Sequence, residues 1–414
     1  MRTLSGINSS SNLDIEAIRF RVVIVTNMPA PYVVPIHQRV AQTPGVSLRV
    51  IYCSQREPNR LWDLPPLDFD HTFLRERFFM VGGRGVRNNL DVALGERCIH
   101  NNPDVISSLK QFSPDVIVTV GFNPTYLYAF GYALLKGLAH VPMTDGTFVS
   151  EQRLSVWHRA VRRFVYARSN AFASASLGGR KIYESYGIKA ERCFKSCLCI
   201  DNDAFSPEPQ REKKLFDFIF CGRIERGKNP HFALNMVLDV ANKLHRKVKI
   251  LFVGAGSEEE SVKNAAALRP DLVEAEFNGF AAQHELPSLY RSARIFIFPT
   301  LFDVWGVVAN EACAAGLPVM VSPNAGVAGE LVLDGENGFV CDLDVSLWAE
   351  RAAMLLTQPD VYQRFSDRSR SLVSEYTFDK AASGLVAACR FALSESGPQN
   401  KKRLLRQQLL RHVD

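Results

Sequence analysis

The sequence predicts an α/β protein made of two doubly wound domains that face a cleft. Apolar runs such as residues 20–26 and 216–221 alternate with helical patterns, which is typical of parallel sheets covered by helices on both faces. The chain of 414 residues exceeds the usual size of one domain, and a polar, proline-containing segment at 201–209 divides it. We expect four parts: a lead-in at 1–18, an N-terminal domain at 19–203, a C-terminal domain at 204–385 and a basic helical tail at 386–414.

Composition narrows the class of protein. A hydrophobic content of 47% and a charged content of 22% are typical of a globular chain with a large core. The net charge of +6 is too weak to indicate nucleic-acid binding, although it suits an anionic ligand or membrane surface. Nine cysteines, mostly in apolar contexts, predict free thiols in a reducing compartment such as the cytoplasm. The longest apolar stretch, 126–141, is interrupted by charged and glycine residues, so it predicts a buried helix rather than a membrane span.

Loops with polar or proline residues follow three predicted strands of the N-terminal half. Because the carboxyl ends of parallel strands border the ligand crevice, these loops are candidates for one wall of a site. The first loop, at 27–32, lacks the G-x-G-x-x-G fingerprint of dinucleotide binding, and a proline-stiffened turn explains it equally well. Asp145 could orient a substrate or take a proton, although a turn residue before Gly146 is the simpler explanation.

The predicted helix at 155–168 is rich in arginine and aromatic residues. Arg159, Arg162 and Arg163 fall on one face, which could lie against anionic lipid headgroups. A solvated basic face explains the same pattern more simply. The basic, amphipathic segment at 401–412 leaves three alternatives open, namely docking on the body of the protein, membrane contact and fraying.

The first anion-binding candidate of the C-terminal half follows the strand at 216–221. Arg223 and Lys228 lie in the loop between this strand and the next predicted helix. Two cations beside a helix N-terminus suit a diphosphate. A basic surface loop is the alternative.

The second candidate follows the strand at 293–298, where Asp303 and Glu311 bracket the start of a helix. Gly306 allows a ligand to approach the backbone, and the first helical N–H groups are free donors for a phosphate. The two acids could accept hydrogen bonds from sugar hydroxyls, so the pattern indicates a ligand with both phosphate and sugar. An acidic helix cap beside a solvated glutamate has equal weight on local chemistry alone.

These motifs, in this order, resemble those of family 4 retaining glycosyltransferases (glycosyl transferases group 1), which have the GT-B fold of two Rossmann-like domains. Asp303 and Glu311 occupy the ends of the family's E-x7-E element. The segment Gly222-Arg223-x4-Lys228 is similar to the family's G-R-x4-K donor-phosphate element. The resemblance is strong over 215–345 and weaker over 20–200.

The resemblance implies roles for individual residues. Arg223 and Lys228 would bind the donor diphosphate, Glu311 would hold the ribose hydroxyls and Asp303 would contact sugar hydroxyls. The implied catalytic residues are Arg223, Lys228, Asp303, Glu311 and Asp145, and the implied acceptor side consists of Pro31, Tyr32, Asn123 and Asp145. The implied donor-binding set is Gly222, Arg223, Lys228, Gly254, Asn278, Gly279, Phe280, Asp303, Val304, Trp305, Gly306, Val307, Val308 and Glu311, with 278–280 near the base.

The sequence departs from the family pattern at two points. Asp303 replaces the commoner glutamate, which shortens the reach of the carboxylate by one methylene and bears on which sugar is accepted. Many relatives carry a histidine in the first domain near the reacting centre, whereas Asp145 is the nearest polar candidate here.

The function that the resemblance implies is that of a hexosyltransferase of class EC 2.4. It would use a UDP-, GDP- or ADP-sugar and a glycan or lipid-linked acceptor in surface polysaccharide biosynthesis. We expect it in the cytoplasm or peripherally at the inner face of the membrane, with no cofactor, metal or nucleic acid.

The D-x-D strings, such as Asp342/Asp344, are interpreted as turn and surface residues. One alternative is a GT-B-fold sugar-nucleotide 2-epimerase, and the Asp303/Glu311 spacing argues against it. The other alternative is a non-catalytic sugar-nucleotide-binding module. The presence of Arg223, Lys228 and Glu311 together argues against that module.

Overall fold

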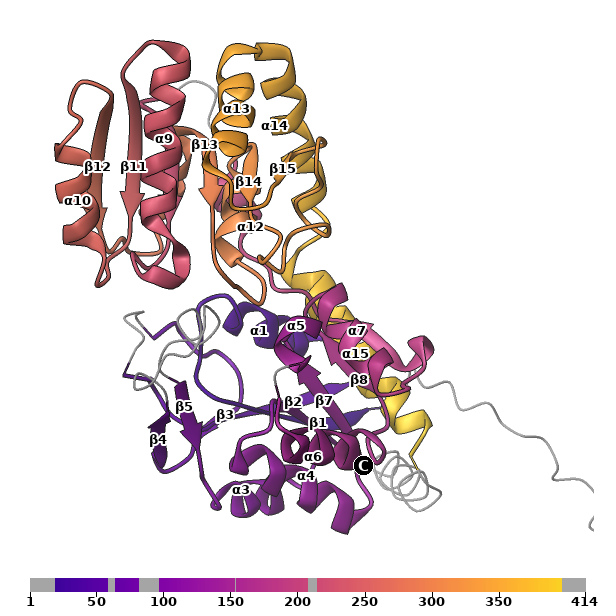
Figure 1. Cartoon of the computed structure of the whole chain (residues 1–414). Helices are drawn as coiled ribbons and strands as arrows, with labels where there is room; N and C mark the ends of the chain where they lie inside the picture. The colour runs from indigo at the N-terminus through magenta and orange to yellow at the C-terminus, as the bar shows by residue number, and fades with distance from the viewer. Residues whose placement is uncertain (1–18, 59–63, 82–96, 153, 208–213, 397–414) are drawn as a thin grey trace, which may run out of the picture.

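A computed structural model describes residues 19–58, 64–81, 97–152, 154–207 and 214–396, which form two layered α/β domains one above the other (Figure 1). Each domain is built on one parallel sheet, and the predicted fold class is therefore confirmed. Among the described residues, no helix combines the length and the apolar character needed to cross a bilayer.

The N-terminal sheet has the strand order β3-β2-β1-β6-β7-β8-β9, and every neighbouring pair in it is parallel. Its strands are β1 (Phe20–Thr26), β2 (Val46–Tyr52), β3 (His71–Phe73), β6 (Val116–Val120), β7 (Ala139–Thr144), β8 (Phe172–Ser174) and β9 (Cys193–Lys195), and β4 (Phe78–Val81) pairs with β5 (Arg97–His100) in a separate antiparallel ribbon. The helical segments are α1 (Val34–Gln42), α3 (Val105–Phe112), α4 (Pro124–Lys136), α5 (Phe148–Gln152), α6 (Val156–Tyr166), α7 (Leu177–Ser185), η2 (Ala190–Arg192) and α8 (Asn202–Phe205).

The C-terminal sheet has the order β12-β11-β10-β13-β14-β15 and is also parallel throughout. Its strands are β10 (Phe216–Cys221), β11 (Val248–Val253), β12 (Val273–Gly279), β13 (Ala293–Phe298), β14 (Val319–Val321) and β15 (Gly338–Val340). The helical segments are η3 (Arg226–Lys228), α9 (Pro230–Leu244), α10 (Glu259–Ala267), α11 (Leu286–Arg291), α12 (Val307–Ala314), α13 (Val345–Thr357), α14 (Pro359–Val373) and α15 (Phe378–Ser394).

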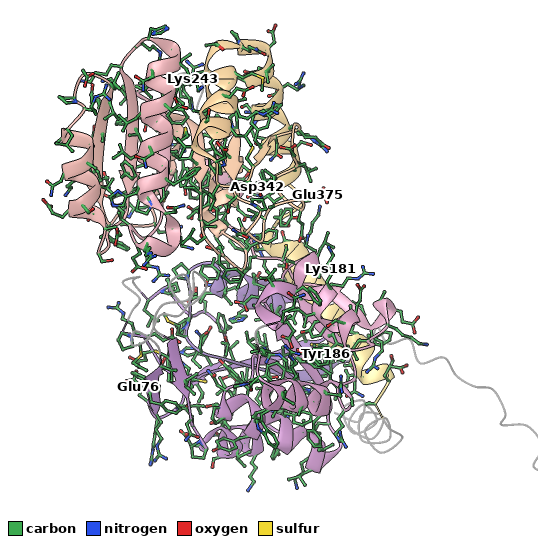
Figure 2. All side chains as sticks on the ribbon, viewed as in Figure 1. Glu76, Lys181, Tyr186, Lys243, Asp342 and Glu375 are labelled. Carbon is green, nitrogen blue, oxygen red and sulfur yellow. The ribbon has the colours of Figure 1, made fainter. Side chains whose placement is uncertain are left out.

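The local sequence explains why these elements form. Central strands such as β10 and β13 are almost entirely buried runs of large apolar residues, as expected for a parallel sheet covered on both faces. Side-chain caps start several helices: Ser155 accepts from the backbone N–H of His158 at α6, and Thr377 accepts from that of Lys380 at α15. Figure 2 shows Lys243, near the end of α9, on the side of the C-terminal domain remote from the N-terminal domain.

The chain passes between the domains twice, and the two crossings lie side by side. The first crossing contains α8, so the segment expected to be a polar linker begins with a helical turn whose Phe205 packs against the ring of Tyr290. The Asn202 amide donates to the backbone carbonyls of Val373 and Tyr376, both at 3.1 Å, which ties the first crossing to the second. After the second crossing, α15 packs on α1, β7 and β9 of the N-terminal domain.

The expected domain boundary after residue 385 falls inside helix α15, so the chain does not divide there. Ala388, Cys389, Ala392 and Leu393 beyond it are all buried. Residues 386–394 are therefore part of a packed helix on the N-terminal domain, whereas the basic segment at 401–412 lies outside the described residues.

Candidate active site

The loop that carries Lys228 is fastened to the loop that carries Asp303. The carbonyl of Gly227 accepts hydrogen bonds from the backbone N–H of Leu301 at 2.9 Å and from the hydroxyl of Thr300 at 3.1 Å. Lys228 Nζ forms an ion pair with Asp303 Oδ2, and both side chains are largely buried. Two residues that lie 75 positions apart in the sequence thus form one charged unit at the carboxyl end of the C-terminal sheet.

Both candidate phosphate-binding cations have carboxylate partners in this structure. Arg223 Nη1 lies 2.9 Å from Glu225 Oε2 in a pair that stays exposed, while Lys228 is held by Asp303. An exposed ion pair contributes little net stability, so the Arg223 side chain can exchange its partner at low cost. A bound diphosphate would compete with these carboxylates for the two cations.

Glycine residues bring the loops after β10, β11 and β12 into backbone contact. Gly222 and Gly254 have φ values of +140° and +128°, and a Cβ on Gly254 would lie only 2.0 Å from the Gly222 carbonyl oxygen. The N–H of Gly254 donates to the carbonyl of Gly279 at 2.7 Å. This packing leaves Phe280, at the end of β12, with a half-exposed ring beside the loops.

The N-terminus of α12 provides backbone donors at the same edge. Gly306 precedes the helix with a φ of +102°, and a Cβ there would lie 2.6 Å from the Phe298 ring, so a side chain is excluded. No side-chain cap bonds to the start of this helix, and Val307 and Val308 are partly exposed. Their N–H groups are the ones that an anion could reach.

The resemblance implies that Trp305 belongs to the donor-binding set, but its polar groups already have partners in the structure. Its ring is buried, and its indole N–H donates to the Asn310 side-chain oxygen at 2.8 Å. Its backbone N–H already donates to Asp303 Oδ1 at 3.1 Å. The backbone N–H of Trp305 therefore helps to orient the Asp303 carboxylate, and both N–H groups of Trp305 are already used within the protein.

Glu311 lies on α12 in a buried pocket of hydrogen-bonding groups. The hydroxyl of Tyr290 donates to Glu311 Oε2 at 2.8 Å, and the Gln283 side chain is a second partner. Burial nevertheless raises the pKa of Glu311 from 4.5 to about 7. The roles of Tyr290 and Gln283 were missed by the sequence analysis, because neither belongs to the E-x7-E element; the spacing of Tyr290 just before β13 was the available signal.

The acceptor-side candidates lie at the carboxyl ends of three adjacent strands of the N-terminal sheet. Pro31 and Tyr32 follow β1, Asn123 follows β6 and Asp145 follows β7. The side chain of Asp145 keeps contact with solvent, yet the surrounding protein disfavours its charged form and raises its pKa. The negative charge of Asp303, in the C-terminal domain, acts in the same direction on the pKa of Asp145.

Glu330 is an interdomain residue that the sequence analysis did not single out. Its carboxylate lies in the C-terminal domain and accepts from the backbone N–H of Leu177 at 2.7 Å, at the start of α7 in the N-terminal domain. Lys195 Nζ of β9 lies 2.7 Å from the other oxygen, and Lys195 also sits 4.2 Å from the Tyr376 ring centre. Glu330 thus fixes the relative position of the two sets of loops.

Metal-binding groups are not brought together in the part of the chain that the structure describes. No three His, Cys, Asp or Glu residues there are arranged to hold an ion. The D-x-D strings have local partners instead: Asp70 pairs with Arg49 at 2.8 Å, Asp201 caps α8 and Asp344 caps α13.

The part of the chain that carries these residues is similar to a known protein family. Residues 201–372 match the family model for Glycosyl transferases group 1. The chain therefore carries a glycosyl transferases group 1 region in its C-terminal half, where Arg223, Lys228, Asp303 and Glu311 lie. The match covers less than half of the chain, and the N-terminal domain lies outside it.

Curated relatives match over a similar length. A glycogen synthase from Mycobacterium tuberculosis (strain CDC 1551 / Oshkosh) is 29% identical over 168 residues, which is 40% of this chain and 40% of that protein. A D-inositol 3-phosphate glycosyltransferase from Frankia alni is 31% identical over 187 residues, 42% of this chain and 45% of that protein. The chain thus spans less than half the length of the curated relatives that it matches.

Solved structures match over nearly the whole chain. Anabaena HepE in complex with UDP superimposes with a TM-score of 0.68 at 15% identity, covering 89% of this chain and 99% of that one. WaaG, a glycosyltransferase of lipopolysaccharide biosynthesis, gives a TM-score of 0.60 at 17% identity, covering 89% and 98%. At such identities the similarity shows the fold, which is the GT-B arrangement of two Rossmann-like domains.

Proposed function

We propose that this chain is a retaining family 4 glycosyltransferase that moves a hexosyl group from a nucleotide-sugar to a glycan or lipid-linked acceptor in surface polysaccharide biosynthesis. The observation that carries the proposal is the Lys228–Asp303 pair beside the uncapped N-terminus of α12. The family match over residues 201–372 supports it, and so does the effect of the Asp303 charge in raising the pKa of Asp145.

In the proposed reaction, the bond between the anomeric carbon and the diphosphate oxygen breaks, and that carbon bonds to an acceptor hydroxyl oxygen. Charge builds up on the departing diphosphate, and Arg223, Lys228 and the first N–H groups of α12 would neutralise it. The acceptor proton would pass to the diphosphate or to Asp145, whose raised pKa suits proton exchange closer to neutral pH. Once Lys228 turns to phosphate, Asp303 is free to accept from a sugar hydroxyl.

The proposed donor is a UDP-, GDP- or ADP-sugar, with Glu311 on the ribose hydroxyls and Phe280 beside the base. Solved structures of similar fold hold UDP, among them HepE and the pneumococcal transferase GtfA. Arg223 and Lys228 would supply the positive charge at the leaving group, so the proposal requires neither a metal ion nor another cofactor. The proposed setting is the cytoplasm, at the inner face of the membrane, and the nine cysteines are all free thiols.

The test is nucleotide release from a panel of UDP-, GDP- and ADP-sugars, with and without a crude lipid extract as the source of acceptor. We expect release from one donor class, stimulated by the extract. No release from any donor in either condition would contradict the proposed function.

A further inference from the structure

Helix α6 turns an apolar face toward solvent. Val156 is 78% exposed, Trp157 82% and Phe164 47%. With Ala160, also exposed, Val156 and Phe164 follow the i, i+4, i+8 spacing that places side chains on one face of a helix. Surface helices ordinarily turn their apolar residues toward the core; α6 buries Val165 and Tyr166 in this way but leaves this second apolar face in solvent.

The side of α6 that faces the protein carries the buried Val165 and Tyr166 and one polar group, the Arg162 guanidinium. Arg162 Nε lies 3.0 Å from Glu151 Oε2, and the Arg162 guanidinium lies 4.3 Å from the Phe122 ring centre. Tyr186, labelled in Figure 2, follows the last residue of α7 and donates its hydroxyl proton to Glu151. This corrects the expected basic face, because Arg162 is turned inward while Arg159 and Arg163 stay exposed.

Positive charge surrounds the apolar face. Arg159, Arg163 and Arg168 are exposed on α6 or just after it, and no aspartate or glutamate occurs between residues 152 and 183. Helix α6 packs beside α4 on the surface of the N-terminal domain (Figure 1), with the rings of Phe130 and Phe164 6.0 Å apart. The exposed surface therefore combines aromatic and aliphatic side chains with arginine and lacks the acids that an ordinary solvated helix carries.

We propose that this α6 face, with α5, binds the surface of an anionic lipid bilayer. Tryptophan and aliphatic side chains enter the headgroup region, and arginine side chains bind lipid phosphates there. The apolar surface continues onto α5 through Phe148 and Val149, which are 40% and 49% exposed. Phe148 lies three positions after Asp145, so the bilayer would lie next to the acceptor side of the candidate site.

This placement deepens the proposed function, on which it rests, by favouring a lipid-linked acceptor over a soluble glycan. Bilayer binding itself does not depend on sugar transfer. The two proposals can therefore fail separately, since vesicle binding needs no donor and nucleotide release needs no vesicle.

The test is flotation of the full-length protein with vesicles of phosphatidylcholine alone or with phosphatidylglycerol added. We expect binding to the anionic vesicles that weakens with added salt, and little binding to the neutral ones. The double variant V156S/W157S should bind anionic vesicles about tenfold more weakly. The control L268S removes a 79% exposed leucine from the C-terminal domain and should bind like the wild type.

A second pair of variants separates charge from apolar contact and from misfolding. Arg163→Glu should weaken vesicle binding about tenfold, whereas Arg163→Lys should preserve it, because the lysine keeps the charge. Unchanged vesicle binding by both V156S/W157S and Arg163→Glu would overturn the proposal. A wild-type chain that ignores anionic vesicles, or that forms a dimer which V156S/W157S abolishes, would overturn it as well and would assign the face to a second copy.

Discussion

The two domains present different chemistry at the loops that face each other. In the C-terminal domain, cations, acids and a helix N-terminus gather within loops that short sequence motifs define, as in the Lys228–Asp303 pair. In the N-terminal domain, the negative charge of Asp303 helps to raise the pKa of Asp145, and apolar surface on α5 and α6 begins a few residues after Asp145. We therefore expect the C-terminal domain to bind the small, charged donor and the N-terminal domain to bind the larger acceptor.

The largest expected effect is on turnover. Lys228→Ala and Arg223→Ala should each lower nucleotide release by at least about 100-fold, because each removes a charge that stabilises the departing diphosphate. Lys243→Ala is the matched control, since Lys243 lies on α9 on the remote side of the same domain and is expected to leave turnover unchanged (Figure 2). Turnover that survives in both loop variants would remove the donor role from this domain.

The second effect is the dependence of stability on pH. The pKa of Glu311 rises from 4.5 to about 7 on burial, so the folded chain holds this proton more tightly than the unfolded chain. Stability should therefore fall by roughly 3 kcal/mol as the pH rises from about 4.5 to about 7, and Glu311→Gln should remove this part of the slope. Urea unfolding at several pH values measures it, and an identical slope in the variant would contradict the assignment.

The third effect is the loss of stability when the contacts of Glu330 between the two domains are weakened. Glu330→Gln weakens the contacts with Leu177 and Lys195, and we expect it to lower the free energy of unfolding by roughly 1–3 kcal/mol. Glu336→Gln removes an exposed partner of Arg368 and should change it by less than about 0.5 kcal/mol. Equal effects of the two substitutions in urea unfolding would show that Glu330 does not join the domains.

The smallest effect concerns the loop after β12. Phe280→Ala should raise the KM for the donor severalfold with little change in stability, because its half-exposed ring is available to stack on a base and contributes little to the core. Steady-state kinetics of nucleotide release measures it. An unchanged KM would place the base elsewhere.

Sequence and structure agree best where a function depends on residues close together in the chain. The alternation of apolar runs with helical patterns predicted both sheets, and the residues from Gly222 to Lys228 were recognisable because one loop carries them all. Contacts between distant segments could not be predicted in this way. Glu330 meets Leu177 across 153 positions, and α15 returns to the N-terminal domain after the whole C-terminal sheet.

Helix α6 shows a second limit of sequence patterns. The spacing of Arg159, Arg162 and Arg163 indicated one basic face, but it could not show which side of the helix the domain would cover. In the structure Arg162 pairs with Glu151 on the side where Val165 and Tyr166 are buried, and Trp157 lies on the solvent side. A periodic pattern thus defines the faces of a helix, whereas tertiary contacts decide which one is buried.

The most direct test of the division between the domains is calorimetric binding of the donor that the nucleotide-release panel identifies. We predict that Lys228→Ala abolishes measurable donor binding, while Asp145→Asn binds the donor within about threefold of the wild type but transfers the sugar more slowly. Loss of donor binding in Asp145→Asn, or wild-type binding in Lys228→Ala, would contradict the account.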